Sequence, residues 1–598
     1  MTNQLNKYSL TWDLDAFFLG GSLSEDFKIY MNHIKTDIKK FELLVSSSEL
    51  KESRDLTIWR NILDIWQDLS CRLGEAEAYI SCLIAQDMRD KEARNLKMNF
   101  SVIESAFNAA LEKLDQLFLE MKKSDWEKMM NDDYFKQVSF PLKERREKIK
   151  ELSSLDKENL IKELAIDGYH AWGDLYSNII SKITIPYTIN GSSKLLSVGQ
   201  AMNILDSSDR SIRQQIFHLL NDIWEREEDL IGSILNHLCG FRLNVYNQRG
   251  WSNPVKESLI NNRISEETLL TMWDVINKNK KGLIQFLERK AKIIGVDKLA
   301  WYDVFAPLGK TKSQMSYEDA VDTIVKKLGE FDMDLSVFAE KVFQEKWIEA
   351  EDRPGKRSGA FCIYFSDSAQ SRIFTTFSGS SSIVSVLAHE IGHAYHQYTM
   401  RDLPKLVQNC GLCLSETASM LTELIVTDST ICETVSKEQK ILLLEEKIRQ
   451  AVSCLLGIQA RFLFETRLNN ERKKGIVSAK RLKELTVQAQ QDAFSDCLSE
   501  YHPWLWASRL HYYITEVPFY NYPYTFGYLF SIGIYKRYSE NKINFSNQFI
   551  ELLKSTGSMT AEELALKYLG VDLTGPEFWQ DAIELIKDDI NNFLELTE

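Results

Sequence analysis

Apolar residues recur every three or four positions over most of the first 180 residues, which is the spacing of one buried helix face. Residues 23–180 are therefore predicted to form long amphipathic helices. Glycine and proline are scarce there, and no cluster of chemically reactive side chains stands out, so the pattern favours a helical scaffold. The clearest stripes are Phe27, Tyr30, Ile34, Ile38, Phe41 and Val45; Ile58, Ile62, Ile65 and Leu69; and Leu111, Leu114, Leu117 and Met121.

The helical period gives way to a strand pattern at Ile183–Ile189. The Asn190-Gly191 pair that follows is typical of a hairpin turn, and Pro186 restricts the strand to the edge of a sheet. We place a domain boundary here. The sequence then predicts an N-terminal helical domain, residues 1–190, and a second domain, residues 191–598, as expected for a chain too long for one core.

The second domain begins with helices and then changes pattern. The helical period returns at Ser211 and holds through residues 266–289. Two short strands are predicted further on, at Phe361–Phe365 and Arg372–Phe377. Ser378–Ser382 then offers polar residues and a glycine suited to a turn and a helix N-cap.

The stretch Ser382–His396 contains the strongest chemical signal in the chain. It is mostly apolar up to its middle and lacks proline, so it predicts a buried helix. His389 and His393 are four residues apart, so both imidazoles project from one helix face and can share a zinc ion. Glu390 can take a proton from the water that the metal activates. Gly392 weakens the helix, which suggests that it allows a neighbouring backbone to come close.

The third metal ligand has to come from further along the chain. In the pattern H-E-x-x-H-x-x-G-x-x-H a glycine and a third histidine would be required where this chain has His396 and Thr399, so that pattern is excluded. A second predicted helix, residues 414–425, offers Glu416 and Glu423, both of which can face the first helix. His396 lies on the ligand face and is a rival, although packing or a nearby hydrogen bond suits it better.

Together these residues resemble the oligoendopeptidase F family of zinc metallopeptidases, with thimet oligopeptidase and neurolysin as more distant relatives. The resemblance rests on His389–His396, on Glu416–Ser419 with Glu423, and on Phe519–Tyr528, and it covers about residues 190–590. It implies that Glu416 is the third ligand and that Glu423 supports the site. It also implies a mostly α, multi-helical zincin fold, with a small β-sheet next to the active-site helix and a deep substrate channel.

A third cluster, residues 501–538, holds nine of the chain's 23 tyrosines. Tyr520, Tyr524 and Tyr528 are four residues apart, as on one face of a helix. Such stripes usually belong to a core, but so many hydroxyl groups suggest a polar-lined cleft. By resemblance, this segment supplies a histidine and tyrosines that bind substrate and stabilise the oxyanion. The candidates are His511, Tyr520 and Tyr524, and Tyr528 could replace either tyrosine.

Composition excludes several other classes of protein. A hydrophobic content of 44% with 26% charged residues is ordinary for a globular protein, and the net charge of −14 argues against a nucleic-acid partner. Nine cysteines at irregular spacing fit a reducing compartment better than a disulfide framework, and the pair Cys410 and Cys413 is more plausible as structure than as a redox motif. Residues Met1–Lys7 show no signal-peptide pattern, and no apolar run is long enough to span a membrane. We expect a cytoplasmic protein.

The sequence therefore predicts a zinc endopeptidase that holds one Zn²⁺ per chain, and the family resemblance implies that it acts on short peptides. Two alternatives belong to other classes. A zinc carboxypeptidase would need a cationic anchor for the substrate carboxylate. A peptide-binding protein without activity is disfavoured, because His389, His393, Glu390 and Glu416 are all present.

Overall fold

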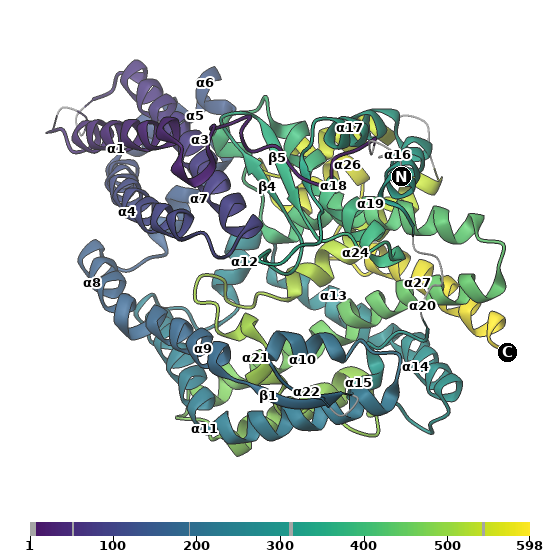
Figure 1. The fold of residues 1–598 in the computed structure, drawn as a ribbon. Coiled ribbons are helices and arrows are strands. Elements are labelled where there is room, and N and C mark those ends of the chain that lie inside the picture. Colours follow the sequence, from purple (N-terminus) through teal and green to yellow (C-terminus); the bar gives the residue numbers. More distant parts are fainter. Residues whose placement is uncertain (1–6, 49, 51–52, 190–191, 310–314, 541–544) are drawn as a thin grey trace. The chain divides into compact units, whose positions relative to one another are not determined.

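The computed structural model describes residues 7–48, 50, 53–189, 192–309, 315–540 and 545–598. Within them the chain is mainly helical, with two small β-sheets (Figure 1). The predicted helical fold class is thereby confirmed. The chain divides into two compact units, each assembled from three stretches: the first unit is Met1–Glu151, Lys312–Ser429 and Arg537–Gly570, and the second unit is Leu152–Thr311, Thr430–Lys536 and Val571–Glu598.

The N-terminal helices of the first unit pack their apolar faces into one core. Asp55 and Asp90 cap two of these helices by accepting hydrogen bonds from backbone N–H groups in the first turn. Helices of the first unit are α1 (Glu25–Val45), α3 (Leu56–Gln86), α4 (Lys91–Glu120), α5 (Lys123–Asn131), α6 (Asp133–Lys136), α7 (Ser139–Lys150), α16 (Tyr317–Phe331), α17 (Met333–Gln344), α18 (Ser381–Met400), most of α19 (Leu412–Glu433), α25 (Phe545–Ser555) and α26 (Ala561–Leu569).

A three-stranded sheet connects the N-terminal helices to the predicted metal helix. Its strands are β3 (Ile348–Glu349), β4 (Phe361–Phe365) and β5 (Gln370–Phe374), in the order β3-β5-β4. Strand β4 is antiparallel to β5 and lies at an edge, whereas β3 is parallel to β5. Both α3 and α18 contact β4 and β5 (Figure 1). Phe365 and Phe374 belong to the core of the N-terminal helices, so the small sheet next to the metal helix is present as predicted.

The second unit is built around the long helix α11 and has its own apolar core. Strands β1 (Ile185–Ile189) and β2 (Ser192–Leu196) form an antiparallel hairpin. Helices of the second unit are α8 (Leu155–Ala165), α9 (Ala171–Lys182), α10 (Val198–Ile204), α11 (Arg210–Gln248), α12 (Lys256–Asn262), α13 (Glu266–Asn279), α14 (Lys281–Ile294), α15 (Trp301–Val304), α20 (Lys437–Val452), α21 (Ile458–Arg472), α22 (Ala479–Phe494), α23 (Leu505–Ser508), most of α24 (Tyr522–Glu540) and α27 (Glu577–Leu596).

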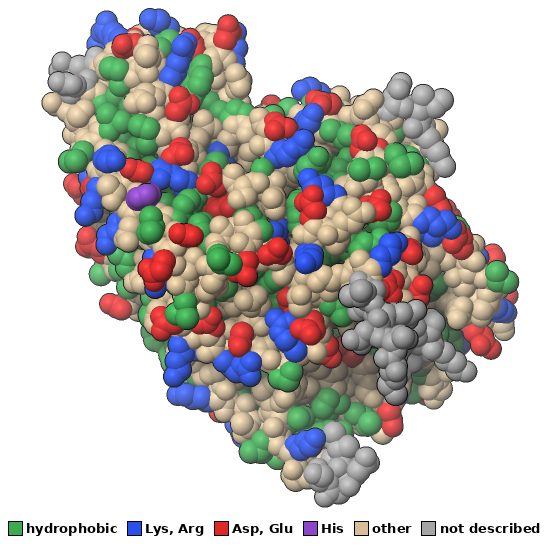
Figure 2. Space-filling view, turned by 45° about the horizontal axis from the view of Figure 1, so that its top comes forward, with side chains coloured by type: hydrophobic (Ala, Val, Ile, Leu, Met, Phe, Trp, Pro, Cys, Tyr) green, Lys and Arg blue, Asp and Glu red, His purple; other side chains and the backbone are tan. Residues whose placement is uncertain are grey.

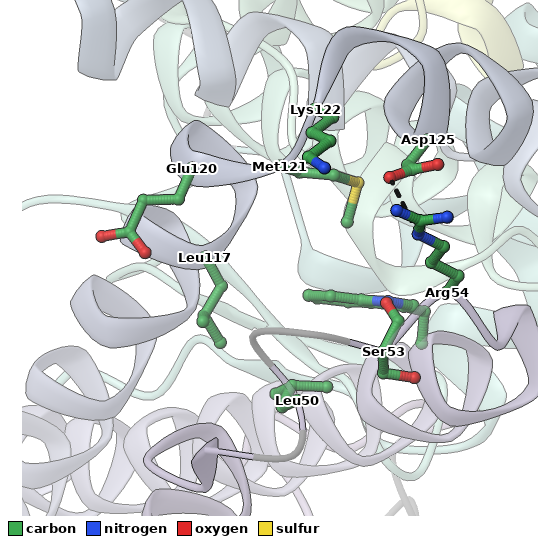
Figure 3. A pocket seen from close by; sticks show the side chains of 9 residues that line it. Leu50, Ser53, Arg54, Leu117, Glu120, Met121, Lys122 and Asp125 are labelled. Carbon is green, nitrogen blue, oxygen red and sulfur yellow. Dashed lines mark hydrogen bonds and ion pairs between the residues drawn. The ribbon is translucent and has the colours of Figure 1, made fainter.

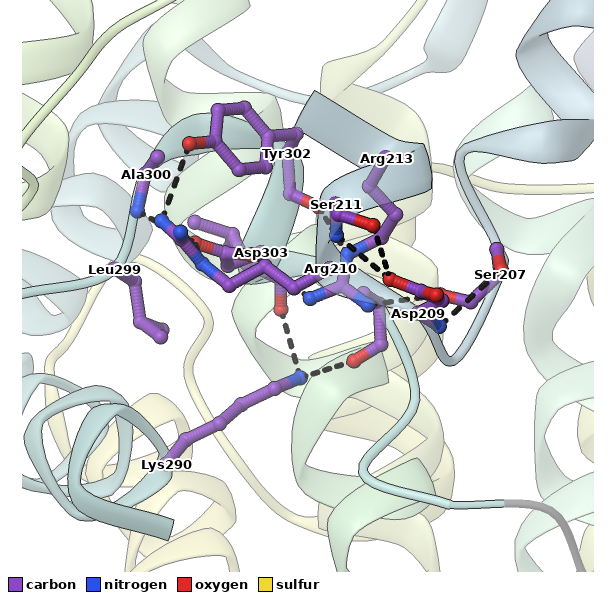
Figure 4. Close-up of polar contacts among 12 residues, drawn as sticks. Ser207, Asp209, Arg210, Ser211, Arg213, Lys290, Leu299, Ala300, Tyr302 and Asp303 are labelled. Atoms are coloured by element: carbon purple, nitrogen blue, oxygen red, sulfur yellow. Dashed lines mark hydrogen bonds and ion pairs between the residues drawn. The ribbon is translucent and has the colours of Figure 1, made fainter. Parts of the chain in front are cut away.

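Three cations of the second unit are paired with buried carboxylates, and Figure 4 shows the two that bind Asp303. Arg213 and Arg210 both bind the fully buried Asp303, with Nη2 to carboxylate oxygen distances of 2.8 and 3.1 Å. Lys290 lies 2.7 Å from a carboxylate oxygen of Glu445 and also donates to the backbone carbonyls of Val304 and Ala306. These contacts supply the counter-charges that buried guanidinium and ammonium groups require.

Most of the predicted helices are confirmed, with differences at their edges. In α3 the stripe faces the core except for Ile58, whose side chain is 39% exposed at the start of the helix; Ile62 and Leu69 are buried and Ile65 is partly buried. Residues 266–289 form two helices, because the chain breaks at Lys280. Strand β5 begins at Gln370, two residues earlier than predicted, where it pairs with the end of β4.

The strand predicted before residue 190 is confirmed, and it does belong to a hairpin. The Asn190-Gly191 turn lies outside the described residues. The division into domains 1–190 and 191–598 stays a prediction, since each compact unit draws stretches from both ranges.

The outer surface has mixed charges and a pocket away from the predicted metal ligands. Acidic and basic side chains are interspersed over the face drawn in Figure 2. A pocket of about 440 Å³ lies among α3, α4 and α5 (Figure 3), and Arg54 and Asp125 in its wall form a 3.8 Å ion pair. None of the predicted metal ligands lines it. None of the described helices is long and apolar enough to cross a membrane.

All nine cysteines are thiols, and five of them are at least partly exposed. We therefore predict that mild thiol reductant leaves activity unchanged, because no disulfide has to stay closed. Peptide hydrolysis should be measured with and without reductant at a concentration that does not extract metal. A loss of activity would instead indicate a structural Cys410–Cys413 bond.

Candidate metal centre

Helix α18 forms where the sequence predicts it. The side chain of Ser380 caps its first turn by accepting a hydrogen bond from the N–H of Ile383 (3.4 Å). Apolar residues such as Leu387 and Ile391 are fully buried, which holds the helix against its neighbours. His389 and His393 are partly exposed, and their ring centroids are 5.0 Å apart.

The neighbouring helix α19 approaches α18 closely at Gly392. A methyl group added there would lie 2.5 Å from Cα of Ser419 and 2.6 Å from the carbonyl oxygen of Ala418. Thr422 donates a hydrogen bond of 2.7 Å to the backbone carbonyl of Ala388, which joins the two helices at the same level. The glycine therefore meets the packing requirement that its position in the sequence suggested.

This close approach brings Glu416 to the two histidines. Its Oε2 atom lies 3.4 Å from Nε2 of His389 and 3.4 Å from Nε2 of His393. One donor atom from each of the three residues falls within 4.8 Å of the others. Two imidazole nitrogens and a carboxylate oxygen that converge in this way suit one metal ion.

Glu423 occupies a different position, behind the first histidine. Nδ1 of His389 donates a hydrogen bond of 3.1 Å to Oε2 of Glu423. When Nδ1 carries the hydrogen, Nε2 of the neutral ring keeps its lone pair for a metal ion. Glu423 thus orients His389, and the choice of Glu416 as third ligand fits this geometry.

The charges of the site favour a cation at the point of convergence. Burial lowers the pKa of His389, but hydrogen bonds to Glu416 and Glu423 outweigh it and raise the pKa to about 10. Burial opposes ionisation of Glu416, yet its hydrogen bonds to both histidines hold its pKa well below the usual range. The donor set therefore stabilises added positive charge, which a divalent metal ion supplies.

Glu390 lies next to this group but is not one of the three converging residues. Its side chain is only 6% exposed. On a helix it is rotated about 100° from His389, so it can reach a ligand at the metal without coordinating the ion. Burial raises the pKa of Glu390, although the two histidines act against this.

His396 does not join the metal group. It is buried, and its Nε2 lies 2.9 Å from Oγ1 of Thr556 and 3.3 Å from the carbonyl oxygen of Leu553. Burial lowers the pKa of His396 to about 4, so the ring is neutral. Of the two roles considered for His396, the structure supports a buried, hydrogen-bonded packing residue over a metal ligand.

His511, Tyr520 and Tyr524 belong to the second unit, where they form a cluster of their own. The rings of His511 and Tyr520 are stacked, with centroids 4.7 Å apart, and the hydroxyls of Tyr520 and Tyr524 are 3.3 Å apart. The prediction that Tyr520, Tyr524 and Tyr528 share one helix is wrong for Tyr520. This residue lies before α24, which begins at Tyr522. Tyr528 is buried (6% exposed).

Comparison with known proteins agrees with this fold. The chain is 22% identical over 616 residues to an oligoendopeptidase F homologue of Lactococcus lactis subsp. lactis, with 98% of this chain and 97% of the relative covered. It is 23% identical over 598 residues to group B oligopeptidase PepB of Streptococcus agalactiae, with 96% and 95% covered. The crystal structure of oligoendopeptidase F from Enterococcus faecium matches with a TM-score of 0.71 at 17% identity, covering 96% of this chain and 99% of that one.

The family is shown by sequence models that match most of the chain. The model of Peptidase family M3 matches residues 203–585, and a model described as Oligopeptidase F matches residues 118–184. The chain therefore belongs to Peptidase family M3 and is a metalloendopeptidase.

We predict that Gly392→Ala weakens metal binding at least tenfold and lowers activity accordingly. The added methyl group must push α19 away from α18 at a typical cost of about 1–3 kcal/mol, and this displaces Glu416 from the histidines. Metal affinity should be measured by competition with a chelator, and folding by circular dichroism. Gly282→Ala is the matched control, because its methyl group would make only ordinary contacts, the nearest at 3.5 Å. Wild-type affinity in Gly392→Ala would contradict this account of the helix contact.

We also predict how metal content depends on the individual side chains. His389→Ala and His393→Ala should lose stoichiometric metal and all activity, and Glu416→Ala should bind metal much more weakly. Glu423→Ala should keep the site with an affinity about 10–100-fold lower, because only the orientation of a ligand is lost. Elemental analysis after dialysis measures all four. Full metal in Glu416→Ala together with loss in Glu423→Ala would exchange the roles of the two glutamates.

Proposed function

We propose that this metalloendopeptidase uses zinc to hydrolyse peptide bonds in short oligopeptides, with Glu390 as general base. The observation that carries the proposal is the convergence of His389, His393 and Glu416 within 4.8 Å, with the buried Glu390 beside them. The fold alone would not identify the reaction, whereas this group of residues defines a specific chemistry.

His389, His393 and Glu416 would hold the zinc ion. A set of two imidazoles and one carboxylate is typical of catalytic zinc sites, which keep a position open for water or substrate. Bound zinc would supply Lewis-acid polarisation of the scissile carbonyl and of the attacking water. Glu423 keeps His389 in the tautomer that leaves Nε2 available.

Glu390 would transfer the proton. Its carboxylate takes a proton from the attacking water as the water adds to the carbonyl carbon, and then gives that proton to the nitrogen of the leaving amine. One proton is moved in two steps, so the carboxylate is regenerated in each cycle. The burial of Glu390 excludes bulk water that would compete for the proton.

His511, Tyr520 and Tyr524 are our candidates for binding substrate and stabilising the oxyanion. The assignment comes from the family resemblance, and the clustering of the three side chains is consistent with it. All three are partly exposed, whereas Tyr528 is buried, which favours the first three as donors to a ligand. A well-placed donor of this kind is worth about 10²–10³ in rate.

Short peptides are the proposed substrates. The names of the relatives, oligoendopeptidase F and oligopeptidase, support this class. Strand β4 lies at a sheet edge and contacts α18, so an extended peptide could pair with it through main-chain hydrogen bonds. The proposal is tested by mass spectrometry of products from peptides blocked at both ends. Internal cleavage supports an endopeptidase, and cleavage restricted to peptides with a free C-terminus would indicate a carboxypeptidase.

We predict that Glu390→Gln keeps stoichiometric zinc and near-normal peptide affinity but loses several orders of magnitude in turnover. Glutamine preserves the shape of the side chain and removes the base. Glu390→Asp should keep a small fraction of activity, since its carboxylate lies one methylene short. Steady-state kinetics and metal analysis on the same preparations measure both effects. Turnover above about a tenth of wild type in Glu390→Gln would require another base.

A further inference from the structure

Two arginines of the second unit border the cluster of His511 and Tyr520: Arg461 donates a hydrogen bond to Asn521, which follows Tyr520, and Arg509 lies two residues before His511, whose ring stacks on Tyr520. Arg461 is on α21, and Arg509 directly follows α23. Both side chains are partly buried but keep some exposure to solvent. The two residues are far apart in the sequence and fit no motif, so sequence analysis did not single them out.

The hydrogen-bonding capacity of these guanidinium groups is largely unused. Nη1 of Arg461 donates to the side-chain oxygen of Asn521 at 3.1 Å, but its buried Nε has no partner. The buried Nε of Arg509 also has none, and no side-chain hydrogen bond or ion pair of Arg509 is found among the described residues. By contrast, Arg213 in the same unit binds the carboxylate of Asp303 (Figure 4), and Lys290 binds that of Glu445.

The electrostatics of the pair are unfavourable as they stand. Burial, and then the charge of Arg461, lower the pKa of Arg509 to about 9. Burial also lowers the pKa of Arg461. The same two causes, burial and the charge of Arg461, lower the pKa of the neighbouring His511 to about 4, so that ring is neutral. A positive site that is partly closed to water is a poor place for unpaired cations, and an anionic ligand would relieve the cost.

The chemistry of the missing partner follows from the donors. A guanidinium group presents a planar fork of N–H donors that matches the two oxygens of a carboxylate. Asn521 links Arg461 to the segment that carries Tyr520, which the proposed function assigns to substrate binding. Tyr512, buried on the same segment, adds a phenol to the electrostatic surroundings of both arginines.

We propose that Arg461 and Arg509 form a binding site for a carboxylate of the peptide substrate. This inference rests on the proposed peptidase function and adds a basis for substrate selection to it. The carboxylate comes either from the C-terminus of the peptide or from an acidic side chain. A C-terminal carboxylate occurs once in each peptide, so its capture would distinguish peptides with a free C-terminus from blocked ones.

Three quenched fluorescent peptides of one sequence separate the two sources. The first ends in a free carboxylate, the second in a carboxamide, and the third keeps the free carboxylate but has its aspartates replaced by asparagines. For wild-type enzyme we expect one replacement to raise KM about tenfold or more while kcat stays within about twofold. A shift with the carboxamide identifies the C-terminus, and a shift with the asparagine peptide identifies an acidic side chain.

Variants connect the effect to the arginines. Arg509→Gln should raise KM for the preferred peptide to the value of its neutral analogue and leave KM for that analogue unchanged. Arg509→Lys should retain part of the discrimination, because it keeps the charge without the fork. Arg467→Gln is the matched control: it removes a charge from the same helix α21, but Arg467 is paired with Asp492, and it should behave as wild type.

Stability and direct binding exclude a merely structural role. Arg509→Gln should not lower Tm, because the side chain has no protein partner to lose. A fluorescent, non-hydrolysable analogue of the preferred peptide should bind wild type at least tenfold more tightly than its neutral counterpart in anisotropy titrations, and this difference should vanish in Arg509→Gln.

The proposal is overturned if wild type treats all three peptides alike, or if Arg509→Gln changes KM equally for all of them. Failure of wild type to cleave any peptide would instead contradict the proposed function, and the anisotropy titrations would still test the carboxylate site.

Discussion

The metal centre depends on how closely two helices can approach each other. Glu416 reaches Nε2 of both histidines because the backbone of α19 lies against α18 at Gly392, where any side chain would collide with it. The hydrogen bond from Thr422 to the carbonyl of Ala388 fixes the same contact. A displacement of about 1 Å there would be large on the scale of metal–ligand bonds, which tolerate only about 0.2 Å.

Several charged and titratable groups surround the contact between α18 and α19. Histidines and Glu416 form the converging group, Glu423 holds His389 from behind, and Glu390 remains beside the group as a separate carboxylate. Three glutamates in so small a volume would repel one another, so the site requires positive charge to be stable. If His389, His393 and Glu416 hold the metal as proposed, Glu390 is left free for a different task, because the coordination is supplied by the other three residues.

Sequence patterns predicted those features that depend on short spacing. The pair His389 and His393, the N-cap region and the amphipathic helices follow from local periodicity, and the structure contains them. Glu416 needed the family resemblance, because its position is set by the packing of two helices. The two-residue strand β3 is too short for a pattern. Tyr520 was assigned to a helix that begins later, at Tyr522, with proline in its first turn where no N–H is needed. Arg461 is on α21 and Arg509 follows α23, so no local sequence pattern links the two residues.

The buried contact of His396 has a consequence for biosynthesis. His396 on α18 is hydrogen-bonded to Leu553 and Thr556 at the end of α25, which are synthesised 157 and 160 residues later. A nascent chain therefore carries the two histidines proposed to bind the metal for the time needed to translate more than a hundred further residues before that anchor exists. The helix that bears them therefore gains this support only after Leu553 and Thr556 have left the ribosome. A product terminated before α25 would lack it.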